Sequence, residues 1–145
     1  MISVVTPSFN QSDWLRLCVA SVADQAGVEH EHLVQDARSA DGTQDWLARD
    51  NRVVAVSEPD HGMYDAINRG LRRATGEICA YLNCDEQYLP ATLARVAAYF
   101  RDHPEVDLLF GDVILVDENG QPVSYRRTVL PDRAHIRAAH LNTTS

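Results

Sequence analysis

The chain has 145 residues, a mass of 16.2 kDa and a formal net charge of −8, from 13 cationic and 21 anionic side chains. This length suits one domain, and a composition of 45% hydrophobic and 23% charged residues is typical of a globular protein rather than a disordered one. The negative charge argues against binding to nucleic acid or to acidic lipid surfaces by bulk electrostatic attraction.

The cation and cysteine usage excludes several further classes. All 13 cations are arginine, and the missing lysine disfavours a Walker phosphate loop and a Schiff-base enzyme. Cys18, Cys79 and Cys84 are odd in number and lack C-x-x-C spacing, which argues against a disulfide framework or a zinc knuckle. The sequence shows no signal peptide and no apolar stretch long enough to cross a bilayer. We therefore expect a cytoplasmic protein, with peripheral membrane contact as an alternative.

Strand and helix patterns alternate along the first part of the chain. The β-branched run at its start predicts a buried strand, and apolar residues at helical spacing follow a possible capping serine. The predicted elements are, in order, strand Ile2–Thr6, a helix capped by Ser12, strand His32–Asp36, a short helix through Trp46 and Leu47, and strand Val53–Ser57.

The alternation continues in the second part, where Met63, Ile67 and Leu71 sit at helical spacing. A hairpin turn is predicted at 117–120, where Asp-Glu-Asn-Gly separates two strand patterns. The predicted elements are a helix from Met63 that ends at Gly76, strand Ile78–Leu82, a helix opened by Pro90, strand segments Leu108–Phe110 and Val113–Val116, strand Pro122–Tyr125, and a weak helix within Pro131–Ser145.

Strands that alternate with helices require crossover connections, which predicts an α/β fold. We expect a three-layer α/β/α arrangement with a mostly parallel central sheet covered on both faces. Ligands bind such sheets beyond the carboxyl ends of the strands. Acidic residues follow the predicted strands there: Asp36, Asp41, Asp60, Asp85 and Glu86.

This acidic rim predicts a metal-dependent site, because clustered carboxylates repel one another unless a cation or hydrogen-bond donors neutralise them. Hard oxygen ligands favour Mg²⁺ or Mn²⁺, which take substrate phosphates as further ligands. A nucleoside diphosphate bound through a bridging ion is therefore expected. The alternative is that these acids are solvated loop residues and helix caps.

Four segments between Ile2 and Gly120 resemble family 2 glycosyltransferases of the GT-A fold, in order and in spacing. They read ISVVTPSFNQSDWLRLCVASVADQ, EHLVQDARSADGT, EPDHGMYDAINRGLRRATGEICAYLNCDE and FGDVILVDENG. The resemblance implies a Rossmann-like nucleotide-binding half, a UDP-, GDP- or dTDP-linked sugar donor and Mn²⁺ or Mg²⁺. It also implies transfer of the sugar, with inversion, to a hydroxyl of a saccharide or lipid-linked acceptor.

The resemblance also implies which residues bind the donor. Asp36 matches the acid that reads the base, and a carboxylate, which only accepts, suits the imide N–H of uracil or thymine or the N1–H of guanine. Asp41 matches a turn acid that we expect to cap the following helix. Arg69 and Arg72 lie near the diphosphate in this reading, with a solvated helix face as the favoured alternative. The implied donor set is Thr6, Pro7, Asn10, Asp36, Asp60, Gly62, Asp65 and Asn68.

The segment Asn83-Cys84-Asp85-Glu86 occupies the Asp-x-Asp metal site of the resemblance, so Asp85, Asn83 and Glu86 are the implied metal ligands. Two of them depart from the pattern, because Asn83 is a neutral amide and Glu86 is one methylene longer than aspartate. Arg38 is a third departure, since the family often has glycine there. Arginine at positive φ is strained, so we expect a different local backbone.

The general base of the family lies in a later segment, and no match for it is found before Ser145. Asp112, in F-G-D-V, is a weak candidate that also suits a strand end. We therefore expect residues 1–145 to form a single family 2 domain, truncated on its acceptor side, that binds the donor without transferring sugar.

Two other function classes stay open. The main alternative is a non-catalytic nucleotide-sugar-binding module. A nucleotidyltransferase is less favoured because the first loop lacks the expected glycines, arginine and lysine, and a dehydrogenase is disfavoured because G-x-G-x-x-G is absent. Truncation also exposes a sheet edge, which favours a homo-oligomer.

Overall fold

The computed structural model describes residues 1–127. The chain divides into two compact units, Met1–Pro104 and Glu105–Ser145. The first unit contains a parallel sheet with its helices, and the described part of the second contains a β-hairpin.

The first unit is built on a four-stranded sheet in the order β3-β2-β1-β4, and every neighbouring pair is parallel. The register pairs Ser8 with Asp36 and Asp36 with Ser57, so the first three strands end level with one another. Their polar ends therefore share one edge of the sheet, as the sequence predicts. The strands are β1 (Ile2–Ser8), β2 (His30–Asp36), β3 (Val54–Ser57) and β4 (Ile78–Tyr81).

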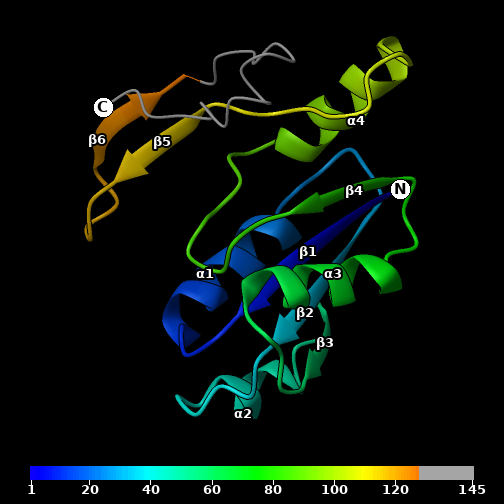
Figure 1. Cartoon of the computed structure of the whole chain (residues 1–145). Helices are drawn as coiled ribbons and strands as arrows, with labels where there is room; N and C mark the ends of the chain where they lie inside the picture. Colours follow the sequence, from blue (N-terminus) through cyan, green and yellow to red (C-terminus); the bar gives the residue numbers. More distant parts are fainter. Residues whose placement is uncertain (128–145) are drawn as a thin grey trace, which may run out of the picture. The chain divides into compact units, whose positions relative to one another are not determined.

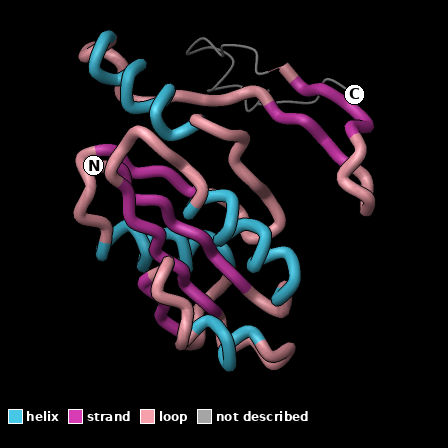
Figure 2. Tube along the Cα trace, turned by 180° about the vertical axis from the view of Figure 1, so that it is seen from behind, coloured by secondary structure: helices cyan, strands magenta, loops and turns pink. Residues whose placement is uncertain are grey.

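Helices cover both faces of this sheet, which confirms the three-layer prediction (Figures 1 and 2). On one face, Ile2 and Val4 pack with Cys18 of α1 and Leu93 of α4. Leu47 of α2 joins a second cluster on the same face, around Val34. The other face carries α3. The helices are α1 (Ser12–Ala23), α2 (Thr43–Leu47), α3 (Met63–Arg73) and α4 (Thr92–Asp102).

The close approach of α3 to the sheet depends on Gly70. A Cβ atom added at Gly70 lies 2.3 Å from Val5 Cγ1 and 3.2 Å from Val5 Cγ2, which is closer than carbon atoms pack. Glycine therefore brings this helix directly onto β1 and fixes the distance between α3 and the sheet.

The described part of the second unit is an antiparallel hairpin of β5 (Val113–Val116) and β6 (Pro122–Arg126). In the turn, the carboxylate of Asp117 accepts the main-chain N–H of Asn119 at 2.9 Å and of Gln121 at 2.8 Å. Gly120 supplies the positive φ of 76° that ends the turn. The predicted hairpin is confirmed.

Several predicted element boundaries are wrong. Residues 108–110 form no strand, because their backbone pairs with no other strand among residues 1–127. The helix predicted to open at Pro90 begins at Thr92, after Ala91 adopts a left-handed φ of 63°. The preceding helix ends at Arg73, because Ala74 is extended, and does not reach Gly76. The helix predicted within 131–145 lies outside the described residues.

In the part of the chain that the structure describes, no helix has the length and apolar character needed to cross a membrane.

Candidate functional site

The first unit has a pocket of about 600 Å³ at the carboxyl ends of its strands, called here the rim pocket. Residues that follow all four strands line it, so the predicted convergence of the strand ends is confirmed. Five of the predicted site residues are among them: Pro7, Asp60, Gly62, Asn83 and Asp85. The remaining lining residues are Ser8, Phe9, Gln11, Ala37, Pro59, Met63, Ala66 and Cys84.

Two buried polar atoms of the rim pocket have no hydrogen-bond partner among the described residues. They are Ser8 Oγ and Asn83 Oδ1, and Ser8 is only 5% exposed. A buried polar atom without a partner costs about 1–3 kcal/mol, so a ligand that supplies the missing partners is stabilised there. Both residues line the pocket.

Asp36 is fully buried and supports the rim rather than lining the pocket. Its Oδ1 accepts the hydroxyl of Ser39 at 2.5 Å, and its Oδ2 accepts the Ser39 N–H at 3.1 Å and the Ser57 hydroxyl at 2.7 Å. These bonds tie the ends of β2 and β3 together. Recognition of a base by Asp36 stays a prediction.

Asn10 joins the loop after β1 to the loop after β2. Its N–H donates to Ser39 Oγ at 2.8 Å, and its Oδ1 accepts the N–H of Ala40 at 2.8 Å. Asn10 and Arg38 both have positive φ, 51° and 59°. The expectation that the backbone at Arg38 avoids this conformation is wrong, because the surrounding Asp36–Ser39 bonds hold it there against a strain of about 1–3 kcal/mol.

Asp41 links the first turns of two helices. Its Oδ1 accepts the N–H of Thr43 at 3.2 Å and the Thr43 hydroxyl at 2.6 Å, and its Oδ2 accepts the N–H of Ser12 at 2.8 Å. Asp41 thus satisfies the N–H of the first residue of α2, although the cap position itself is Gly42. The predicted cap at Ser12 is wrong, because Ser12 is the first residue of α1 and the cap position is Gln11; the Ser12 Oγ accepts the indole N–H of Trp46 at 2.9 Å.

Arg69 holds the loop between β3 and α3, which carries Asp60 and Gly62. Its guanidinium donates to Pro59 O at 3.0 Å and pairs with Glu58 at 2.9 Å and Asp65 at 2.8 Å. Hydrogen bonding from Arg69 lowers the pKa of both carboxyl groups. The half-buried Arg69 side chain therefore holds this loop through three partners, Pro59, Glu58 and Asp65.

The same loop is also held by its own carboxylates. Asp60 Oδ1 accepts the N–H of Gly62 at 2.9 Å, and Asp65 Oδ2 accepts the N–H of His61 at 3.0 Å. Gly62 has a φ of 105°, a conformation that favours glycine, and it immediately precedes α3. Asn68 is exposed on α3 and does not line the rim pocket.

The structure places Thr6 inside the core rather than in the pocket. Its hydroxyl lies 2.8 Å from His32 Nε2 and 3.7 Å from Cys18 Sγ. Burial lowers the pKa of His32 to about 4 and raises the pKa of Cys18 to about 12, so both groups are neutral near pH 7. The donor role of Thr6 stays a prediction.

The implied metal ligands lie in one turn after β4. Asp85 is exposed and lines the rim pocket together with Asn83. Glu86 Oε2 accepts the main-chain N–H of Asn83 at 3.2 Å, which steadies the turn. Between residues 1 and 127, no three carboxylate, imidazole or thiol side chains gather into a metal-binding group. Burial, with the nearby charge of Asp85, raises the pKa of Cys84, which favours a packing role.

Five lining residues that sequence reasoning did not select stand just after predicted strands: Ser8, Phe9, Ala37, Pro59 and Cys84. This position was the signal for each. Asp112 belongs to the second unit, where its carboxylate accepts the hydroxyl of Tyr125, and this bond raises the pKa of Tyr125. An acceptor-side role for Asp112 stays a prediction.

Comparison with solved structures supports the fold. A mannosyltransferase, PcManGT from Pyrobaculum calidifontis in complex with GDP-Man and Mn²⁺, is 27% identical with a TM-score of 0.63, over 70% of this chain and 32% of that one. S. aureus TarS 1-349 in complex with UDP-GlcNAc has a TM-score of 0.65 at 24% identity, over 71% of this chain and 32% of that one.

Comparison with other sequences gives the family. A "PGL/p-HBAD biosynthesis glycosyltransferase" of Mycobacterium bovis (strain BCG / Pasteur 1173P2) is 36% identical over 126 residues, which is 82% of this chain and 49% of the relative. The chain thus spans about half the length of the curated relatives it matches. The family model for glycosyl transferase family 2 matches residues 3–143. With the parallel sheet, these matches show that the chain belongs to glycosyl transferase family 2.

Proposed function

We propose that the rim pocket binds the nucleoside diphosphate of a sugar donor, and that the chain is the donor-binding part of a glycosyltransferase. One observation carries this proposal. Residues after all four parallel strands line a single pocket, which holds two unpartnered buried polar atoms and an exposed carboxylate. The mannosyltransferase of similar fold contains GDP-Man and Mn²⁺, which supports a nucleotide-sugar ligand of this class.

In this proposal Phe9 contacts the base. Its ring is 60% exposed although it lines the pocket, so it offers an aromatic face on which a nucleobase can stack. Ser8 precedes Phe9 as the last residue of β1, and its Oγ has no hydrogen-bond partner among the described residues. Asp36 holds the neighbouring loop. Its carboxylate is buried, so it contacts the base only if the carboxylate becomes exposed. Uracil, thymine and guanine all present the N–H that a carboxylate accepts.

The diphosphate lies near the start of α3. Gly62, Met63 and Ala66 line the pocket there, and the cap of α3 has no side-chain hydrogen bond. The first N–H groups of a helix carry partial positive charge and favour a bound phosphate. Because the chain has a net charge of −8, binding an anion depends on a local group of donors such as these N–H groups.

Asp85 and Asn83 fit a divalent ion as two oxygen donors on one side of the pocket. The orphaned Asn83 Oδ1 is the observation that favours this, because a buried amide oxygen needs a partner. Mg²⁺ and Mn²⁺ commonly use one or two protein carboxylates and take substrate phosphates and water for the remaining positions. When bound, such an ion stabilises the negative charge on the departing diphosphate. Glu86, which accepts the N–H of Asn83, is the third ligand of the proposed set.

The proposed reaction is a single in-line displacement that inverts the anomeric carbon. The acceptor hydroxyl forms the new glycosidic bond as the bond to the diphosphate breaks, and a carboxylate takes the hydroxyl proton. The rim pocket positions the donor for this step. Asp112 is the candidate for the proton acceptor among the described residues, and an acid in a later segment of the family's sequence is the alternative.

Titration calorimetry with UDP, GDP and dTDP in the presence of Mn²⁺ tests the proposal. We expect one of the three to bind, and Asp85→Ala to weaken it at least about tenfold because a charged ligand to the ion is lost. Asp102→Ala removes an exposed carboxylate on α4, outside the pocket, and serves as the matched control. Equal binding by wild type and Asp85→Ala contradicts the metal assignment, and no binding by wild type contradicts the donor pocket. Donor hydrolysis or sugar transfer measured on the full-length protein separates a transferase from a module that only binds.

A further inference from the structure

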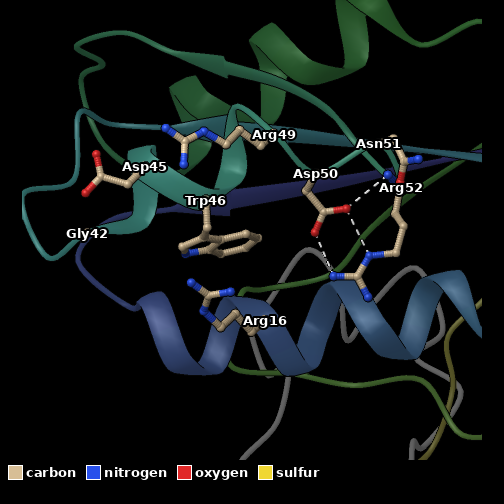
Figure 3. A pocket seen from close by; sticks show the side chains of 8 residues that line it. All are labelled: Arg16, Gly42, Asp45, Trp46, Arg49, Asp50, Asn51 and Arg52. Carbon is tan, nitrogen blue, oxygen red and sulfur yellow. Dashed lines mark hydrogen bonds and ion pairs between the residues drawn. The ribbon is translucent and has the colours of Figure 1, made fainter.

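The first unit has a second pocket, of about 610 Å³, between α1 and the segment that joins α2 to β3 (Figure 3). We call it the Arg16–Trp46 pocket. It shares no lining residue with the rim pocket. Its lining residues are Arg16, Gly42, Asp45, Trp46, Arg49, Asp50, Asn51 and Arg52.

Positive charge gathers in this pocket although the chain is acidic overall. One of its two carboxylates, Asp50, is already neutralised. Arg52 forms a bidentate ion pair with Asp50, with Nε at 2.9 Å from Oδ1 and a terminal nitrogen at 2.6 Å from Oδ2. This bonding lowers the pKa of Asp50 and keeps the pair ionised. The pocket lining holds two further cations, Arg16 and Arg49, and one further carboxylate, Asp45.

Arg16 is arranged so that its hydrogen-bond donors stay available. Its guanidinium carbon lies 4.3 Å from the centre of the Trp46 ring, and the ring is fixed by the bond from its N–H to Ser12 Oγ. Stacking uses the face of a guanidinium and leaves the N–H groups at its edge free. Within residues 1–127, neither Arg16 nor Arg49 forms an ion pair.

We propose that the Arg16–Trp46 pocket is a second anion site, which binds the phosphate group of an organic phosphate. Guanidinium groups match phosphate geometry, and phosphate oxygens point in several directions, so they can accept from groups that approach from different sides. The volume is several times that of a phosphate alone, which leaves room for the molecule that carries it. The net charge of −8 favours a soluble phosphate ester over an anionic lipid surface.

Trp46 provides a direct reporter of this site. The chain contains two tryptophans, so Trp14→Phe leaves Trp46 as the sole indole, and Trp14 is 41% exposed, which makes the replacement mild. Binding of an anion by Arg16 changes the charge next to the ring. We expect inorganic phosphate and glycerol 3-phosphate, in metal-free buffer, to shift the Trp46 emission in a saturable manner.

Variants in this background decide the proposal. Arg16→Ala and Arg49→Ala are each expected to weaken phosphate binding at least about tenfold, and high salt to weaken it further. Arg95→Ala removes one exposed charge from α4, outside the pocket, and is expected to bind normally. Vesicles of phosphatidylglycerol, with phosphatidylcholine as reference, identify a lipid source if they bind through Arg16 better than the soluble phosphates do.

The following results would contradict the anion-site proposal. If neither the soluble phosphates nor the anionic vesicles give a saturable shift, the pocket is not an anion site. If Arg16→Ala and Arg95→Ala bind with the same affinity, binding reflects net charge alone. If phosphate binds with unchanged affinity to both Arg16→Ala and Arg49→Ala, its site lies elsewhere and the proposal is overturned.

Discussion

The main-chain N–H of Asn10 donates to Ser39 Oγ at 2.8 Å, although the two residues are 29 positions apart in the chain. The same hydroxyl donates to the buried Asp36 carboxylate at 2.5 Å. One side chain therefore joins the loops after β1 and β2. Ser39 is 2% exposed, so its removal leaves buried groups without partners.

Ser39→Ala is expected to lower the free energy of unfolding by about 1–3 kcal/mol, because a buried carboxylate and a main-chain N–H each lose a partner. It should also weaken nucleotide binding, because the Asn10 loop is released. Urea unfolding and calorimetry measure the two effects. Ser57→Ala is the matched control, since it removes another hydroxyl from Asp36 without touching Asn10. Equal loss of nucleotide binding in both variants argues that the Asn10 contact is irrelevant.

Arg69→Ala is expected to weaken nucleotide binding several-fold with only a small loss of stability. The side chain holds Pro59, Glu58 and Asp65, while the exposed parts of such ion pairs contribute little to folding. Arg72→Ala, exposed on the same helix, removes the same charge without opening the loop. The idea fails if the two variants bind nucleotide equally well.

Asn83→Asp tests the proposed ion site by adding a carboxylate to it, whereas Asp85→Ala removes one. A carboxylate at this half-buried position beside Asp85 should repel it, so the melting temperature falls without metal. Mn²⁺ should reverse the fall and bind more tightly than in the wild type, because a carboxylate is the stronger ligand. Thermal melts with and without Mn²⁺, and electron paramagnetic resonance of free Mn²⁺, measure this. A melting temperature that does not respond to Mn²⁺ removes Asn83 from the ligand set.

His32 should make folding stability depend on pH. Burial is the main cause that lowers its pKa from 6.5 to about 4 in the folded chain. Between these values the unfolded chain binds a proton that the folded chain does not, so stability falls as the pH drops from 6.5 to about 4. The loss attributable to His32 approaches about 3 kcal/mol at the lower end. Above pH 6.5 this group has no effect on stability.

Urea unfolding between pH 7 and pH 4 measures this dependence. His32→Gln keeps a polar partner for Thr6 and is expected to flatten the curve by the amount given above. His61→Gln changes an exposed loop histidine and should leave the slope intact. Identical slopes in the wild type and His32→Gln show that other groups cause the pH dependence.

Pro7, Asp60 and Asp85 could be placed at one site from the sequence because each follows a recognisable strand pattern. The roles of Asp36 and Arg69 could not be predicted in this way. Asp36 has the right position for a ligand contact, yet the hydroxyls of Ser39 and Ser57 surround it. In the sequence, Arg69 lies on the polar face of a predicted helix. Its partner Pro59 O comes within reach only when the loop before α3 has folded.

By itself, the sequence determined the order of strands and helices and the edge at which the polar loops meet. Hydrophobic periodicity marks the elements, and crossover connections make the strands parallel, so their carboxyl ends must share one edge. Only the tertiary structure decided which of those polar side chains face a ligand, and it brought Arg16 onto Trp46 beside a pocket that no motif marks. The reason is physical: side-chain partners depend on distances between residues far apart in the chain, and local pattern carries no information about those distances.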